Sequence, residues 1–201
     1  MRHTPWIKHQ IPKEKPYLIL GKGPSLERVF EQPELLDEYH TIALNHAGIL
    51  FADKVDYVHF VDMDVPYGFK DQIPNVKKWI CPWHPHVNFK ASIFPLTNYQ
   101  VSNTKKSTFY WYNSSKSRIH NAPKDPVIKL HYTSAESVFQ LLYHQGIKEV
   151  HSVGIEGGKE YHKTMLEIGL KPLTCGQISF DRGFFQLDKI CKYLNIKWKK
   201  L

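Results

Sequence analysis

Asp62 and Asp64 stand one residue apart, directly after the apolar segment Tyr57–Val61. Carboxylate oxygens are the ligands that Mg²⁺ and Mn²⁺ prefer, and two of them at the end of a rigid strand can hold such an ion against a diphosphate. The pattern is short and recurs by chance, so a loop cap or a surface charge explains it equally well. Both interpretations of the aspartate pair stay open at this point.

Twelve histidines are a high number for a chain of 201 residues. A zinc site needs three or four ligands that converge, and a lone His-x-His such as His84 and His86 is a weak signal. A single histidine that acts as a general base is a simpler role, because its pKa lies near working pH. His162 is the preferred candidate, since it follows a glycine turn and Tyr161. A structural role is the alternative for each histidine.

A glycine turn follows the apolar segment Leu18–Leu20. Gly21 and Gly23 can adopt backbone angles that other residues avoid, and they let a ligand approach the main chain. Pro24 and Ser25 suit the first turn of a helix, whose free N–H groups attract anions. The segment lacks the third glycine of the dinucleotide fingerprint and the G-K-[S/T] of a Walker loop. A structural turn and a ligand-binding turn therefore both remain open.

Length and composition are typical of one globular domain. A chain of 201 residues can bury a sizeable core, and a content of 42% hydrophobic and 23% charged residues argues against wholesale disorder. Apolar runs are too short to span a membrane, and the N-terminus lacks a signal-peptide core, so the sequence predicts a cytoplasmic location. Cys81, Cys175 and Cys191 have no metal-site spacing and are interpreted as reduced thiols.

The formal net charge of +8 favours anionic partners. The lysines are scattered along the chain, so a solvated basic surface is the alternative to a dedicated polymer site. Nucleic acid is not an expected partner, because the aromatic stretch Phe109–Tyr112 alternates like a strand with one buried face. A weak association with the surface of the inner membrane, through the basic C-terminus that contains Trp198, is a further expectation.

The order of the predicted elements gives the fold class. Short apolar strands alternate with helical stretches, which predicts an α/β protein with a mostly parallel, twisted sheet and helices on both faces. Residues 1–201 are expected to form a single Rossmann-like domain. Residues 1–16 carry three prolines and predict an extended N-terminal arm. Residues 88–126, approximately, predict an irregular insertion or a lid.

Four short segments occur in the same order as in the bacterial sialyltransferases of glycosyltransferase family 42: Leu20–Leu26, Ala43–Asn45, Tyr132–Ala135 and Ser152–Glu156. The chain resembles that family in patches over most of its length. It is similar in part to the pterin-diphosphokinase-like and motility-accessory-factor proteins. Asp62-x-Asp64 also resembles the D-x-D signature of glycosyltransferases.

The resemblance implies a site for the nucleotide of a CMP-sugar at the ends of the strands and at the start of a helix. The residues to which it assigns nucleotide contacts are Gly21, Lys22, Gly23, Asn45, Asp62, Thr133, Ser134, Ala135 and Glu156. Tyr161 is the best match to a family tyrosine that holds the leaving phosphate, where it would stabilise developing charge. The resemblance thus places the reaction at the carboxyl edge of the predicted sheet.

Two departures from the family pattern concern the chemistry. The family's G-N-G turn is G-K-G in this chain, and the family's general-base histidine ahead of the last helix is absent from the segment Gln177–Asp181. Asp181 therefore becomes a second candidate base beside His162.

The sequence as a whole predicts a glycosyltransferase-like enzyme. It would move a sugar of the sialic-acid or Kdo type from a CMP-linked donor to the hydroxyl of a glycan or lipid-linked glycan, and this reaction requires no cofactor. One alternative is a diphosphokinase-like transferase that uses ATP and holds Mg²⁺ or Mn²⁺ on Asp62 and Asp64. Another is a catalytically silent module that binds a nucleotide or a glycan.

Overall fold

The computed structural model describes residues 2–68, 76–87, 94–99, 107–115, 124–130, 133–158, 160–169 and 179–201. Within these residues the chain forms a nine-stranded sheet in the order β1-β6-β5-β4-β3-β2-β8-β9, with β7 beside β6. Each strand pair is parallel. The strands are β1 Arg2–Pro5, β2 Tyr17–Leu20, β3 His40–Leu44, β4 Tyr57–His59, β5 Lys78–Pro82, β6 Thr108–Ser114, β7 Val127–Ile128, β8 Glu149–Val153 and β9 Lys197–Lys200.

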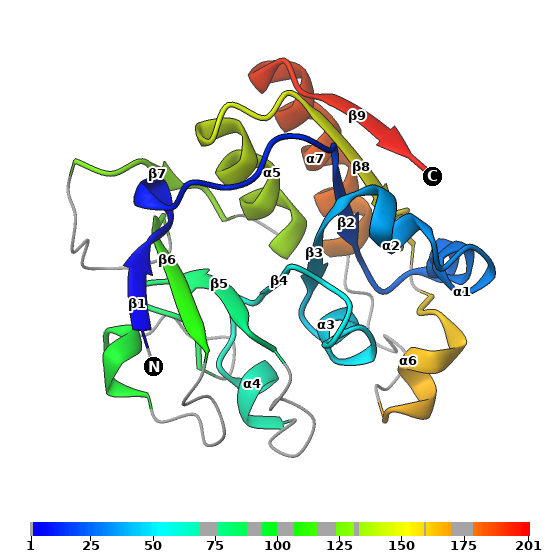
Figure 1. Cartoon of the computed structure of the whole chain (residues 1–201), viewed down its shortest axis with the longest axis horizontal. Helices are drawn as coiled ribbons and strands as arrows, with labels where there is room; N and C mark the ends of the chain where they lie inside the picture. The colour runs from blue at the N-terminus through cyan, green and yellow to red at the C-terminus, as the bar shows by residue number, and fades with distance from the viewer. Residues whose placement is uncertain are drawn as a thin grey trace.

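Helices cover both faces of this sheet (Figure 1). The α-helices are α1 Glu27–Glu31, α2 Leu35–Glu38, α3 Ala47–Leu50, α4 Asp64–Gly68, α5 Ser134–His144, α6 Lys163–Glu167 and α7 Ser179–Leu194. Short 3₁₀ turns are η1 Trp6–Lys8, η2 Pro24–Leu26 and η4 Leu96–Asn98. Pro33 lies between α1 and α2 and interrupts the helical stretch that they form. The predicted α/β fold with a mostly parallel sheet is confirmed.

Strand β2 lies at the centre of the core, and all four of its side chains are fully buried. Tyr17 and Ile19 pack with α5 and α7 on one face of the sheet. Leu18 and Leu20 pack with α1, α2, α3 and α6 on the other face. Successive strand residues point to opposite faces, so a strand covered on both sides must be apolar throughout. Burying one such side chain contributes about 1.5–3 kcal/mol.

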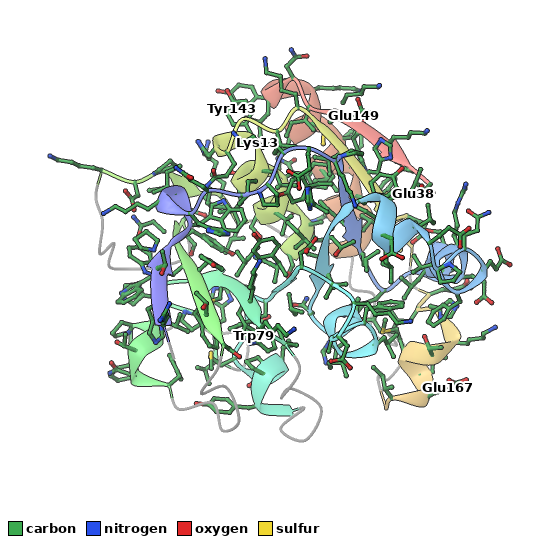
Figure 2. All side chains as sticks on the ribbon, viewed as in Figure 1. Lys13, Glu38, Trp79, Tyr143, Glu149 and Glu167 are labelled. Atoms are coloured by element: carbon green, nitrogen blue, oxygen red, sulfur yellow. The ribbon has the colours of Figure 1, made fainter. Side chains whose placement is uncertain are left out.

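The second half of the sheet has its own apolar layer against α4 and η4. Side chains fill the space between the sheet and the helices, as Figure 2 shows around the labelled Trp79. The Trp79 ring is only 1% exposed and stacks on Phe109, with ring centroids 6.0 Å apart. The described layers therefore form a packed core on each side of the sheet.

The expected N-terminal arm is wrong for the first residues. Arg2–Pro5 forms β1, an edge strand that pairs in parallel with β6. Trp6 follows it, is 2% exposed, and donates its indole N–H to the Leu141 carbonyl over 3.1 Å. Prolines are compatible with this position, because an edge strand needs hydrogen-bond donors on one side only. The chain start is therefore part of the fold.

The expected insertion at residues 88–126 is also wrong in part. Thr108–Ser114 forms β6, which pairs with β5 on one side and with β1 on the other. Phe109 is fully buried, and Tyr112 is 4% exposed, so this strand belongs to the core. Residues 88–93, 100–106 and 116–123 of the expected lid lie outside the described residues.

The chain changes direction across the sheet at β2. Strands β3, β4, β5 and β6 follow on one side of β2, whereas β8 and β9 lie on the other. In open α/β sheets, ligands bind beyond the carboxyl ends of the strands at such a switch point. The carboxyl edge of β2, β3, β4 and β8 is therefore the place to examine for a functional site. In the described part of the chain, none of the helices combines the length and apolarity that crossing a bilayer requires.

Candidate functional site at the carboxyl edge of the sheet

The glycine turn after β2 packs directly against the loop that follows β8. The Gly21 N–H donates to the Val153 carbonyl over 2.8 Å, and the Gly23 N–H donates to the Gly154 carbonyl over 2.9 Å. A Cβ atom at Gly21 would overlap the Gly154 carbonyl oxygen, and one at Gly23 would overlap the Glu156 carboxylate. Gly21 is thus required by the close approach of two loops, because its Cβ would meet main-chain atoms, whereas the Glu156 side chain that opposes Gly23 can move aside. The contact at Gly21 supports the structural interpretation of the turn.

Glu156 binds this turn in place of an external anion. The Ser25 N–H donates to Glu156 Oε1 over 2.6 Å. The Ser25 hydroxyl in turn accepts from the Gly154 N–H over 2.7 Å. The free N–H group that the sequence offers to a ligand is therefore taken by the protein's own carboxylate. The nucleotide contact predicted for Glu156 stays a prediction, and it would have to replace the contact with Ser25.

Lys22 is the cation at this edge. Its side chain is partly buried and its Nζ lies 4.7 Å from the centre of the Tyr161 ring. None of the ion pairs found among the described residues includes Lys22. Burial lowers the pKa of Lys22 from its ordinary 10.5 to about 8, and the negative charge of Asp62 opposes this lowering. Lys22 therefore carries a poorly solvated positive charge that an anionic ligand would stabilise.

Asn45 ends β3 in the left-handed backbone region, with φ of 51°. Asparagine adopts this conformation more readily than most residues. Its Nδ2 donates to Ser134 Oγ over 3.2 Å, which ties the end of β3 to the start of α5. Its Oδ1 is buried and accepts no hydrogen bond from the described residues. Asn45 thus offers an unmet acceptor at the carboxyl end of β3, the strand next to β2, and the nucleotide contact predicted for it stays a prediction.

His46 follows Asn45, and the positive charge of Lys22 acts on its ring. The pKa of His46 is lowered to about 4, first by burial and then by the Lys22 ammonium. The ring is therefore neutral at pH 7 and leaves Lys22 as the positive charge of this pair. Lys22 after β2 and His46 after β3 are therefore close enough for their charges to interact.

The start of α5 is held by its own capping box. The Thr133 N–H donates to Glu136 Oε1 over 3.1 Å, and the Thr133 side chain caps the third residue of the helix. Ser134 is partly exposed and engaged with Asn45. Ala135 is 4% exposed and packs into the core, so its side chain serves the fold. Of the three predicted contacts, Ser134 lies closest to the site through its bond to Asn45.

The two aspartates have different surroundings. Asp62 is partly buried beside His86, with Oδ1 3.3 Å from His86 Nδ1. Asp64 is exposed at the start of α4. In the described part of the chain, no group of three or more His, Cys, Asp or Glu side chains is arranged to hold a metal ion. The structure therefore does not support a metal site on Asp62 and Asp64. Such a site stays a prediction of the diphosphokinase-like alternative.

His162 has a structural role, which argues against the predicted general base. It is 4% exposed and is the N-cap of α6, with Nδ1 accepting from the Thr164 N–H over 3.3 Å. Its Nε2 is hydrogen-bonded to the Glu27 carboxylate, and its ring stacks on Phe30 with ring centroids 5.1 Å apart. Both ring nitrogens are occupied, so neither is available to an acceptor hydroxyl. The main-chain N–H of His162 donates to the Lys22 carbonyl over 2.8 Å.

Changing His162 to alanine should therefore lower stability. We expect the free energy of unfolding to fall by about 1–2 kcal/mol, because an N-cap and a stacked ring are lost together. His162→Asn is the matched variant, since asparagine is a good N-cap and should recover part of the loss. Thermal unfolding of both variants checks this order. An alanine variant as stable as the original protein would contradict the structural role.

Of the two other predicted catalytic residues, the structure describes the side chain of Tyr161 but not that of Asp181. Tyr161 is half-buried below the Lys22 ammonium, and burial raises the pKa of its hydroxyl. It therefore stays protonated at neutral pH and can donate a hydrogen bond to a phosphate. Asp181 belongs to α7, but its side chain lies outside the described residues.

The sequence analysis missed a buried polar chain under this edge. His59 is fully buried at the end of β4, with Nε2 2.9 Å from the Tyr112 hydroxyl and 3.0 Å from Ser137 Oγ. The Ser137 hydroxyl donates to the Ser134 carbonyl over 2.7 Å. Burial lowers the pKa of His59 to about 3, so the ring is neutral. The sequence signal for this network was a histidine at an inward-facing strand position. In the structure, the His59 ring joins β4 and β6 to the start of α5.

The fold and its polar edge define an α/β protein of the Rossmann-like class. Comparisons with protein-family models, with curated proteins and with solved structures found no match. The argument for function therefore rests on the geometry of the carboxyl edge and on the chemistry of its side chains.

Proposed function

We propose that this protein is a glycosyltransferase-like enzyme that binds a CMP-linked sugar at the carboxyl edge of β2, β3 and β4. The observation that carries the proposal is Lys22, a partly buried ammonium next to Tyr161 and without an ion-pair partner among the described residues. An unpaired, poorly hydrated cation stabilises a bound phosphate more strongly than an exposed lysine does.

The neighbouring groups suit the rest of a nucleotide. Asn45 Oδ1 is a buried acceptor that no donor of the described residues meets, and such an atom costs about 1–3 kcal/mol until a donor meets it. Ribose hydroxyls and the amine of cytosine are donors of the required kind. Ser134 holds the Asn45 side chain in place from the start of α5. The choice of CMP follows the resemblance of four chain segments to the sialyltransferase family.

The reaction proposed is direct displacement at the anomeric carbon. An acceptor hydroxyl oxygen bonds to that carbon, and the bond from the carbon to the phosphate oxygen breaks. The electron pair leaves with the phosphate, where the Lys22 ammonium and the Tyr161 hydroxyl would stabilise the added charge. No metal is needed for this step.

A thermal-shift panel of CMP, CDP, UDP, GDP and ATP, each with and without Mg²⁺ or Mn²⁺, tests the proposal. CMP at 100 times its Kd should stabilise the protein by roughly 2.7 kcal/mol, or several degrees in Tm, without a metal. Lys22→Met should remove this shift, whereas the exposed Lys54→Met should keep it. A shift that appears only with ATP and a metal would instead favour the diphosphokinase-like alternative. No shift with any nucleotide would overturn nucleotide binding.

A further inference from the structure

Asp62 and His86 extend two neighbouring strands beyond their carboxyl ends. Asp62 follows β4 and His86 follows β5, and the two residues form a parallel bridge. The His86 N–H donates to the Val61 carbonyl over 2.9 Å, and the Met63 N–H donates to the His86 carbonyl over 2.8 Å. These main-chain bonds on either side of Asp62 fix the position of the two side chains relative to each other.

The side chains meet at one nitrogen of the histidine ring. His86 Nδ1 lies 3.3 Å from Asp62 Oδ1, which is ion-pair distance, and this oxygen accepts no hydrogen bond from the described residues. A carboxylate beside Nδ1 favours the tautomer that carries its proton there, and this leaves a lone pair on Nε2. His86 is 7% exposed, and its Nε2 is buried without a hydrogen-bond partner among the described residues. A buried nitrogen left without a partner has lost its hydration without gaining a hydrogen bond, and a ligand hydroxyl would supply that bond.

This pair belongs to the same edge as the proposed phosphate site. The charge of Asp62 acts on Lys22 and raises the pKa of that ammonium against the effect of burial. It also acts on Tyr112, the neighbour of His59. Asp62 thus lies between the cation at the end of β2 and the histidine that follows β5. A role for this pair in the reaction requires that a ligand whose phosphate meets Lys22 has its reacting part on the side of β4 and β5.

Two other histidines of this edge, His162 and His59, are engaged differently. Both ring nitrogens of His162 have partners, in Thr164 and in Glu27. His59 points its Nε2 at Tyr112 and Ser137 inside the core. His86 combines a carboxylate at one nitrogen with an unmet lone pair at the other, which is the arrangement that a general base needs.

We propose that His86 is the general base of the transfer and that Asp62 is its positioning residue, an inference that rests on the proposed function. His86 Nε2 takes the proton of the acceptor hydroxyl as its oxygen bonds to the anomeric carbon. The bond from that carbon to the phosphate oxygen breaks, and CMP leaves with the electron pair. The proton on His86 then passes to solvent, so the products are the glycoside, CMP and one proton.

The decisive variant is His86→Asn. The asparagine amide nitrogen can take the place of Nδ1 beside Asp62, but nothing replaces Nε2. With CMP-N-acetylneuraminic acid or CMP-Kdo as donor and lactose as acceptor, kcat for CMP release should fall by about 10²–10⁴-fold. The Kd of CMP should stay unchanged, because binding rests on Lys22 and Asn45.

His151→Asn is the matched control. His151 is 6% exposed and also faces a carboxylate, with Nε2 3.0 Å from Glu149 Oε1, but it lies within β8 away from the carboxyl edge. This variant should lose stability and keep its kcat. Full activity in a folded His86→Asn variant would overturn the assignment. If the original protein turns over neither donor, the proposed function fails instead.

Nitrogen-15 NMR of the His86 ring tests the pair without any substrate. The original protein should show a protonated Nδ1 and an unprotonated Nε2. Asp62→Asn should shift this balance toward the other tautomer and lower kcat, which a purely structural aspartate would not do. A proton on Nε2 in the original protein would overturn the role of His86, whatever donor is used.

Discussion

Gly21→Ala is expected to lower the free energy of unfolding by about 3 kcal/mol or more. The added methyl group would lie 2.6 Å from the Gly154 carbonyl carbon and 2.7 Å from Ile155 Cγ1, and it would overlap the Gly154 oxygen. Two of these atoms belong to the main chain. They cannot move aside easily, because Leu20 and Val153 are paired in the sheet directly before the contact. Urea denaturation measures the loss.

Gly158→Ala separates the steric effect from backbone strain. A Cβ at Gly158 meets no atom of the described residues within 4 Å, although its φ of +81° lies in the left-handed region. This variant should lose only about 1–2 kcal/mol, the usual cost of that conformation for an alanine. Equal losses in both variants would contradict the packing explanation. Little loss in Gly21→Ala would favour the other interpretation of the turn, in which glycine admits a ligand.

The fold was predictable because its signals are local. The inner strands are short and mostly apolar, as is typical of strands buried on both faces. Asn45 could also be placed at a strand end, since β3 stops directly before it. The chain start was not predictable in the same way. Its prolines indicate an arm, but Trp6 buries its ring against the distant α5, and that contact is invisible in a local pattern.

The candidate site was predictable only in outline. Strand ends place Lys22, Asn45 and Asp62 at one edge, and the structure brings Lys22 within the field of Asp62. The partners of each side chain depend on contacts between residues far apart in sequence. Glu27 meets His162 over 135 positions, and this contact occupies the ring nitrogen that the helix cap leaves available to a substrate.

Lys22→Met should make the protein more stable at pH 7, by about 3 kcal/mol. Burial lowers the pKa of Lys22 from 10.5 to about 8, so the folded state holds the ammonium less well than the unfolded state does. Each pKa unit corresponds to about 1.4 kcal/mol. Methionine keeps a similar apolar stem and removes the charge, so the destabilising contribution disappears.

The pH dependence identifies the source of this gain. Below pH 8 both states carry the Lys22 proton, so the folded protein bears the whole cost. Between about pH 8 and 10.5 the unfolded state binds more protons than the folded state, and the stability contributed at this position rises with pH. The advantage of Lys22→Met should therefore be largest at pH 7 and shrink toward pH 10. Urea denaturation of both proteins at the two pH values gives the difference.

Lys54→Met controls for the loss of one positive charge from a chain of net charge +8, because Lys54 is exposed. It should leave stability almost unchanged at both pH values. A Lys22→Met variant that is less stable than the original at pH 7 would contradict the unfavourable burial of this ammonium.

Ligand binding explains why a protein keeps a lysine that lowers its stability, because the buried charge binds the ligand. Addition of CMP tests that link on the same pair of proteins. The nucleotide phosphate should offset the cost of the Lys22 charge in the original protein and give it a rise in Tm, whereas Lys22→Met should gain almost none. Without CMP, Lys22→Met would then be more stable than the original protein. Addition of CMP would stabilise the variant less than it stabilises the original protein. This opposite ordering is expected only if the charge that destabilises the fold is also the charge that binds phosphate.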